Sequence, residues 1–176
     1  MNDAKTQFPA LFREMYWEWG PMYAQFALHD VAPTPISNVN LIPYTRDGWL
    51  ILRLANDEWA MPGGTLEADE TYIEALHREL LEEAGARVLS FQPLGAWHCR
   101  SLAAKPYRAH LPHPQFYRFV CVGEVQLVAQ PLNPLDAEQV IAVDVVPLEE
   151  VVRRFMAQQR PEMAQLYQLA AKVMAG

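Results

Sequence analysis

The chain is poor in cysteine and has no excess of positive charge. Only two cysteines, Cys99 and Cys121, occur in 176 residues, too few for a disulfide framework, and without C-x-x-C spacing we expect buried free thiols. Lysine and arginine number 14 against 21 aspartates and glutamates, a formal net charge of -7. Because proteins that grip nucleic acid broadly neutralise its phosphates with basic side chains, we expect no nucleic-acid partner.

Long apolar runs, internal repeats and low-complexity stretches are also missing. The apolar segments are interrupted by charges or prolines well before the length of a membrane span, and the N-terminus, with Asp3, Lys5 and Arg13, lacks the basic-then-apolar order of a signal peptide. We therefore expect a cytoplasmic protein with no membrane partner. The hydrophobic fraction of 51% suffices for a sizeable core, and this length predicts one domain, residues 1–176.

The segment from Thr71 to Ala84 predicts an amphipathic helix. It contains no glycine or proline, and its apolar residues recur at steps of three and four, as one buried stripe requires. Asp69 is the expected N-cap, with Glu70 in the first turn. Gly85 follows the last periodic residue, where a left-handed C-terminal residue is favoured.

Three glutamates crowd one side of this helix. Glu79 lies three residues before Glu82 and four before Glu83, so their side chains are neighbours that repel. Arg78 relieves this only in part, because a base preceding an acid is the less favourable order. A hard dication such as Mg²⁺, held by a few carboxylates, waters and phosphate oxygens, would supply the missing charge. The alternative is the solvated face of an ordinary surface helix.

Two glycines precede the helix. Gly63 and Gly64 follow Pro62, and such a sequence predicts a turn from a strand into a loop, where the backbone approaches another group closely or adopts positive φ. The alternative is a turn with no further role.

Aligned on Gly64, this segment resembles the Nudix box, a family pattern written G-x5-E-x7-R-E-U-x-E-E-x-G-U, in which U is a bulky apolar residue. Leu80 fills the first apolar position, whereas Ala86, at the last, is smaller than usual, a departure that concerns packing. The charged and glycine positions are filled by Gly64, Glu70, Arg78, Glu79, Glu82, Glu83 and Gly85.

The resemblance implies a role for each residue of the box. It implies an Mg²⁺ site, with Mn²⁺ as a substitute, whose ligands are the Gly63 carbonyl, Glu79, Glu82 and Glu83. In the family the first glutamate and the arginine, here Glu70 and Arg78, hold the loop against the helix, so Gly64, Glu70 and Gly85 are the structural positions.

A carboxylate from a loop late in the chain often serves the family as a further ligand or as the base for water. Asp136 and Glu138 lie in such a loop, and Glu138 is the expected residue because the following segment resembles the family's entry to its last helix. The weak point of that alignment is Val145, which occupies the place of a tryptophan. An ordinary surface charge is the alternative for Glu138. The expected catalytic residues are Glu82, Glu138 and Arg78.

Outside the box, the pattern alternates between strands and helices. Strands are expected at 37–44 and 49–54, joined by a turn at 46–48, and again at 87–97 and 116–128, with helices at 148–158 and 162–174. With the resemblance, this order implies an α+β fold, an α/β/α sandwich around a mixed β-sheet.

An aromatic-rich segment precedes these elements. Residues 8–29, interrupted by Gly20 and Pro21, predict two short helices or one broken helix. This places an N-terminal helical extension at 1–35 ahead of a core at 36–176. We expect its aromatic side chains to pack on the sheet or to form a homodimer face; stacking on a ligand is the alternative.

A long loop at 98–114 concentrates basic and imidazole groups in an otherwise acidic chain. From this loop we expect Arg100, Lys105 and Arg108 to contact an anionic substrate. Arg53, near the end of a strand, is a fourth candidate, for which an ordinary exposed role is equally open. A zinc site formed by His98, His110 and His113 is disfavoured because their neighbours are prolines rather than regularly spaced ligands; solvated loop histidines are the plain alternative.

The expected activity is hydrolysis of a diphosphate linkage in a nucleoside diphosphate attached to another group, with a small phosphorylated nucleotide as substrate. A nucleotide-binding or regulatory module with the same fold and no catalysis is the competing hypothesis. Such relatives usually lose carboxylates of the box, and this chain keeps them all.

Overall fold

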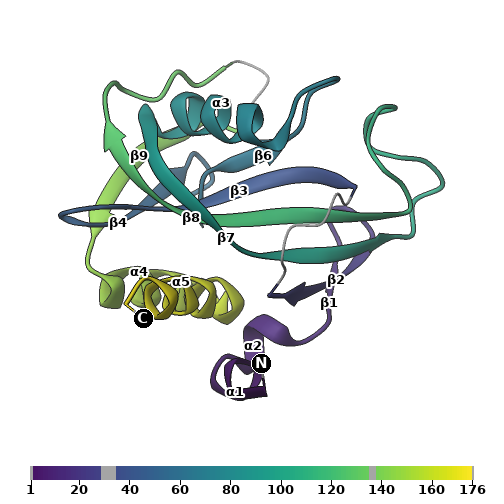
Figure 1. Ribbon diagram of the computed structural model, residues 1–176, viewed down its shortest axis with the longest axis horizontal. Helices are drawn as coiled ribbons and strands as arrows, with labels where there is room; N and C mark the ends of the chain where they lie inside the picture. The colour runs from purple at the N-terminus through teal and green to yellow at the C-terminus, as the bar shows by residue number, and fades with distance from the viewer. Residues whose placement is uncertain (1, 29–34, 135–137, 176) are drawn as a thin grey trace.

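A mixed β-sheet separates two layers of helix (Figure 1). The computed structural model describes residues 2–28, 35–134 and 138–175. Its main strand order is β1-β2-β7-β8-β3-β4-β5, with β6 paired to β3 and β9 paired to β4. The β3 and β8 strands run parallel, and the β7–β8 and β4–β9 pairs are antiparallel. The expected α+β sandwich around a mixed sheet is confirmed.

The two longest connections between elements are residues 102–114, between β7 and β8, and residues 128–139, between β8 and β9. The strands are β1 (Met15–Trp17), β2 (Met22–Ala27), β3 (Ile36–Thr45), β4 (Gly48–Leu54), β5 (Trp59–Ala60), β6 (Gly63–Thr65), β7 (Ala86–Ser101), β8 (Gln115–Leu127) and β9 (Val140–Val146). The helices are α1 (Asn2–Gln7), α2 (Pro9–Phe12), α3 (Tyr72–Ala84), α4 (Leu148–Ala157) and α5 (Pro161–Ala175).

Each face of the sheet has its own apolar core. On one face α3 buries Leu76 and Leu80 against strand residues such as Leu41. On the other face α4 and α5 bury Phe155 and Tyr167 in a second cluster, and Figure 1 shows this helix pair on the side of the sheet opposite α3. Burial of both faces explains the continuous apolar runs Leu50–Leu52 in β4 and Phe119–Val122 in β8.

The helix expected at the box is confirmed as α3, but its N-cap is not Asp69. Thr71 caps the helix: its hydroxyl accepts a hydrogen bond from the Glu74 N–H at 3.3 Å, and the Glu74 carboxylate accepts one from the Thr71 N–H at 2.8 Å. This reciprocal capping box satisfies two exposed N–H groups at once. Asp69 instead has a left-handed φ of 64° in the preceding turn. At the other end Gly85 is left-handed with φ 59°, as expected.

The helical prediction for residues 8–29 is wrong over most of its length. Of its described residues, 8–28, only Pro9–Phe12 is helical, and the segments Met15–Trp17 and Met22–Ala27 are paired strands. Met22, Ala24 and Phe26 are buried and alternate with more exposed neighbours, and β2 pairs with β7 along its whole length. The hydrogen-bonding edge of β7 therefore decides the conformation of this segment. A homodimer contact through it stays a prediction.

The remaining boundaries agree with the sequence patterns, with extensions. The hairpin between β3 and β4 is confirmed, and β7 runs four residues beyond the expected strand, to Ser101, so the basic loop begins at Leu102. The two C-terminal helices are confirmed as α4 and α5. Among the helices of the described residues, none combines the length and apolar character needed to cross a membrane.

We expect Tyr167→Phe to destabilise the protein by about 1–2 kcal/mol, because it leaves the buried Leu50 carbonyl without its donor. The Tyr167 hydroxyl donates to that carbonyl at 3.0 Å in the core. Urea unfolding measures the effect. Tyr16→Phe, a change of the same kind at a ring that is 48% exposed, is the control; equal stability of the two variants would contradict the prediction.

Candidate metal and catalytic site

The short strand β6 brings the double glycine against the middle of α3. Gly63 has φ 148°, and a Cβ at this position would collide with the Val39 carbonyl and the Asn40 side chain. The Gly63 N–H donates to the Glu83 carboxylate at 2.8 Å. The expected close backbone approach is confirmed for Gly63. A Cβ on Gly64 would overlap the Glu79 carboxylate, so Gly63 allows the close approach of β3 and Gly64 leaves room for an acidic side chain.

Arg78 is the centre of the acidic cluster. Its guanidinium donates twice to Glu70, at 2.8 and 2.9 Å, and also to Glu79 at 2.9 Å and to Glu82 at 3.3 Å. A further donor reaches the Thr65 carbonyl of β6 at 3.3 Å. This guanidinium therefore fastens the loop between β6 and α3 to the helix, as the box resemblance implied for Glu70 and Arg78. Fork-shaped donation to a carboxylate is characteristic of arginine.

The carboxyl groups of the cluster are in unequal environments. Hydrogen bonds from Arg78 lower the pKa of Glu70. Burial raises the pKa of Glu79, although Arg78 opposes the shift. Burial also raises the pKa of Glu83, to about 8; the Gly63 N–H opposes this rise, and the charges of Glu79, Glu138 and Glu82 add to it. Three carboxyl groups thus share one guanidinium, whereas Glu83, which accepts from the Gly63 N–H instead, has a strongly raised pKa.

The donor chemistry of this cluster suits a hard dication. Its ligating atoms are all oxygens, and the Glu83 carboxyl lacks a positive counter-charge. Over the described residues, no three acidic, histidine or cysteine side chains are gathered closely enough to hold an ion as they stand. The reason is visible in the contacts: Arg78 holds Glu79 and Glu82, whereas Gly63 holds Glu83. To hold Mg²⁺, Glu79 or Glu82 would have to exchange its contact with Arg78 for one with the ion.

The loop carrying Glu138 is fastened beside the same cluster. The Glu82 carbonyl accepts from the Leu132 N–H at 2.8 Å, and the Asn133 side chain both donates to the Val140 carbonyl and accepts from its N–H. Glu138 is exposed, and its charge acts on Glu83. Glu138 therefore lies within electrostatic range of Glu83, and its role as base or ligand stays a prediction. Asp136 lies outside the described residues.

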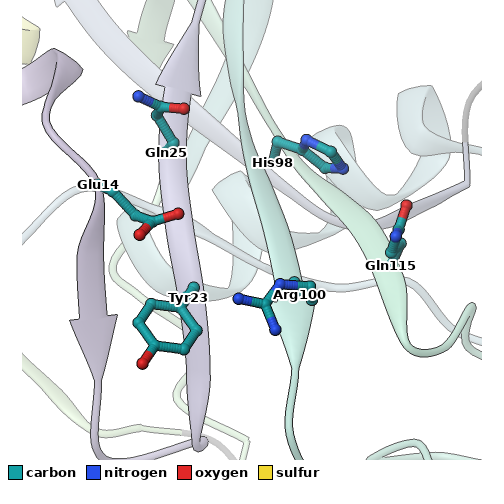
Figure 2. A pocket seen from close by; sticks show the side chains of 6 residues that line it. All are labelled: Glu14, Tyr23, Gln25, His98, Arg100 and Gln115. Atoms are coloured by element: carbon teal, nitrogen blue, oxygen red, sulfur yellow. The ribbon is translucent and has the colours of Figure 1, made fainter.

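The candidate substrate contacts are dispersed over the molecule. Arg53 pairs with Asp57 at 2.8 Å. Arg100 lies over the Tyr23 ring at 4.8 Å and faces a pocket of about 140 Å³ at the β2–β7–β8 end of the sheet (Figure 2). The pocket is lined by Glu14, Tyr23, Gln25, His98, Arg100 and Gln115. Neither the residues that line this pocket nor the Arg53–Asp57 pair belong to the acidic cluster. The structure therefore does not bring Arg53 or Arg100 together with that cluster.

The loop between β7 and β8 contacts the segment of the box through His110. His110 Nε2 lies 2.9 Å from the Leu66 carbonyl, just after β6. Lys105 and Arg108 are exposed, and Arg108 lies over its neighbour Tyr107. His113 contacts the Ala103 carbonyl, and His98 stacks on Tyr117 with ring centres 4.9 Å apart. The three histidines thus have separate partners.

Comparisons with known proteins decide the family. The model of the NUDIX domain matches residues 35–169. The chain belongs to the Nudix family. Two relatives, both named RNA pyrophosphohydrolase, come from Halorhodospira halophila, 35% identical over 120 residues, and Stenotrophomonas maltophilia, 34% identical over 95 residues. These alignments cover 66% and 51% of this chain but only 62% and 43% of the relatives, so the chain spans about half of the length of the proteins it matches.

Solved structures of low sequence identity share the Nudix fold. A pyrophosphohydrolase of Bacillus subtilis aligns with a TM-score of 0.58 at 19% identity, over 89% of this chain and 96% of its own. A NUDIX hydrolase from Nitrosomonas europaea aligns with a TM-score of 0.57 at 22% identity, over 78% of this chain and 89% of its own. At these identities the likeness concerns the fold.

Two residues of the Nudix site were not anticipated from the sequence. Thr65 links α3 to β3. Its carbonyl accepts a hydrogen bond from Arg78 on the helix, and its hydroxyl accepts one from Asn38 on β3 at 2.9 Å. Asn133, with φ 46°, holds the Glu138 loop. An asparagine between prolines is a recognisable turn signal, whereas nothing local distinguishes Thr65.

We expect Gly64→Ala to weaken Mn²⁺ binding about tenfold or more without unfolding the protein, since the new methyl group displaces the Glu79 carboxylate. Titration followed by electron paramagnetic resonance measures free Mn²⁺. Ala68→Ser, which also adds one atom but in the exposed part of the same loop, should bind as the wild type does. Unchanged affinity in Gly64→Ala would show that this carboxylate is not a ligand.

The metal-free protein should lose stability between pH 5 and pH 8 on account of Glu83. Its pKa in the folded state, about 8, exceeds the ordinary value of 4.5. Unfolding therefore releases a proton in this window, and the stabilisation present at low pH disappears as the pH rises, by about 1.4 kcal/mol for each unit of the shift. Glu83→Gln, which retains an acceptor for the Gly63 N–H, should flatten this dependence in urea unfolding with a chelator present. A slope equal to that of the wild type would refute the assignment.

Proposed function

We propose that this protein hydrolyses a diphosphate linkage in a nucleoside diphosphate attached to another group, with Mg²⁺ or Mn²⁺ as cofactor. The proposal rests on the acidic cluster around Arg78, which consists of Glu70, Glu79, Glu82 and Glu83. This cluster gathers all the acidic residues of the Nudix box beside the Gly63–Thr65 strand, and it leaves more carboxyl groups than one guanidinium can neutralise. A surface helix that served stability alone would not bury such a group of like charges.

The residues that would hold the ion are Glu79, Glu82 and Glu83, with the Gly63 carbonyl. When bound there, a divalent ion supplies charge neutralisation for the phosphate oxygens and lowers the pKa of a coordinated water. Glu82 is one candidate to accept the proton of the attacking water, because its contact with Arg78, at 3.3 Å, is the longest that this guanidinium makes with a carboxylate. Glu138 is the other, since it is exposed beside Glu83. Arg78 keeps the loop and the helix in register and offsets part of the negative charge.

The substrate belongs to the class of molecules that carry a phosphate chain on a nucleoside. Two relatives are named RNA pyrophosphohydrolase, which adds the 5′ end of an RNA to that class. The sequence argued against binding along a broad basic surface, but a terminal phosphate chain needs only a small site. Such an RNA therefore belongs among the substrates to be tested, beside nucleoside triphosphates, ADP-ribose and dinucleoside polyphosphates.

A nucleotide-binding module without catalysis is the competing function. It would retain the fold and the exposed loops, but it has no need of the buried carboxyl groups. Because all box carboxylates are present and gathered in this chain, hydrolysis is the better-supported function.

We expect the wild type to release phosphate or pyrophosphate from at least one member of this panel in the presence of Mg²⁺, and none with a chelator. Glu82→Gln should lower kcat about 10- to 1000-fold, the range for loss of an electrostatic catalytic group. Product analysis by chromatography identifies the bond that is cleaved.

Glu58→Gln is the matched control, since it removes one negative charge from an exposed turn and should leave kcat unchanged. Tight binding of nucleotides with no turnover across the panel would establish the binding module instead. Turnover that persists in Glu82→Gln would exclude this residue, and a kcat lowered in Glu138→Gln would then assign the base to the late loop.

A further inference from the structure

The Arg118 guanidinium has an unusual set of neighbours. Arg118 lies on β8, is half-buried, and sits over the rings of Trp17 and Trp19 at 5.7 and 5.3 Å. It makes no hydrogen bond or ion pair with any other described residue, in contrast to Arg78. Burial lowers the pKa of Arg118, which means that its positive charge is poorly solvated where it lies. A poorly solvated guanidinium that forms no ion pair with a described residue is a suitable partner for an anionic ligand.

The two tryptophans form a stacked pair that is only partly explained by packing. Trp17 meets the core residue Trp97 edge-on at 5.5 Å. Trp19 stacks on Trp17 with ring centres 5.6 Å apart and planes 23° apart, yet it is 69% exposed. Core packing therefore accounts for Trp17 and leaves most of the Trp19 side chain in solvent. An exposed indole fixed in a stack is a preformed surface for another planar ring.

Neighbouring strands link Arg118 to the acidic cluster through Asn38 and Thr65. Arg118 is the direct neighbour of Asn38 on β3, and Asn38 is the direct neighbour of Thr65 on β6. The Asn38 amide donates to the Thr65 hydroxyl, while Arg78 donates to the Thr65 carbonyl. Two strand spacings, about 10 Å, therefore separate the backbone of Arg118 from that of Thr65.

Glu138 gives a second link between the two places. Its negative charge raises the pKa of Glu83 and also that of Arg118. Since Coulombic interactions weaken with distance, the late loop lies within electrostatic range of both groups. The separation suits a nucleotide whose phosphate chain reaches the acidic cluster while its base lies farther along the sheet.

We propose that Trp17, Trp19 and Arg118 form a nucleotide subsite in which the base stacks on Trp19 and the phosphate nearest the nucleoside pairs with Arg118. Trp17 and Trp19 precede the region matched by the family model, residues 35–169, so this chain's own N-terminal hairpin supplies the stacking surface. The subsite deepens the proposed function, on which it rests for the nature of the substrate. It assigns the guanidinium an anionic partner, which none of the described residues supplies through an ion pair.

Binding of adenosine 5′-monophosphate, measured by isothermal titration calorimetry in metal-free buffer, tests the subsite without any turnover. Ribose 5-phosphate lacks the base and adenosine lacks the phosphate, so both should bind more weakly. Trp19→Ala should raise the dissociation constant for the monophosphate about 5- to 100-fold, the usual range for one lost stacking contact. Arg118→Met should weaken the binding of the monophosphate and leave the affinity for adenosine nearly unchanged.

Leu89→Ala and Arg13→Met are the matched controls, because each removes an exposed apolar or cationic side chain elsewhere. Both should bind the monophosphate as the wild type does. Trp19 is exposed, so its variant keeps the test decisive even if Arg118→Met lowers the Tm. Absence of binding at millimolar monophosphate, equal binding of ribose 5-phosphate, or wild-type affinity in Trp19→Ala each overturns the subsite.

Kinetics separate this proposal from the proposed function. With a substrate that is turned over, Trp19→Ala should raise KM and preserve kcat, whereas Glu82→Gln lowers kcat. Turnover with an unchanged KM in Trp19→Ala would remove the subsite and leave hydrolysis standing. Monophosphate binding that depends on Trp19 in a protein without turnover would remove hydrolysis and leave the subsite standing.

Discussion

The guanidinium of Arg78 connects the parts of this molecule that matter for its chemistry. It reaches Glu70 in the loop, Glu79 and Glu82 on the helix, and the Thr65 carbonyl on β6. Only arginine presents enough donors in a rigid plane to join a strand, a loop and a helix at once. Without it, the acidic side of α3 would face the Gly63–Thr65 strand with no positive charge between them, and the loop would have no fixed position relative to the helix.

This arrangement costs stability in order to gather charge. Glu79 is only 9% exposed, and the crowding around Glu83 opposes its ionisation. A protein selected only for stability would place leucine or alanine at such positions. The surrounding structure offsets the cost through two well-packed apolar clusters, one on each face of the sheet. Crowded and partly buried like charges within an otherwise well-packed fold are typical of a site that binds a ligand or an ion.

The sequence patterns were informative where a segment's own periodicity or spacing decides its structure. The helix α3 and its glycine C-cap follow from local rules, and so do the β3–β4 hairpin and the C-terminal helices. The N-cap was misassigned because Asp69 and Thr71 are both good capping residues, and the T-x-x-E spacing to Glu74 should have decided between them. The strands β1 and β2 differ from the expected helix because aromatic side chains suit either structure, and the edge of β7 pairs with β2, which in turn pairs with β1.

By itself the sequence determined the family, the helix that carries the carboxylates and the identity of the residues around Arg78, because these depend on fixed spacing within about two dozen residues. The tertiary structure alone decided which distant groups share their surroundings. It placed Glu138 within electrostatic range of Glu83, and it set the N-terminal tryptophans against Arg118 on a strand about a hundred residues later. It also left Arg100 at a separate pocket. Such contacts depend on strand order and register, which hydrogen bonding between remote segments establishes and no local pattern encodes.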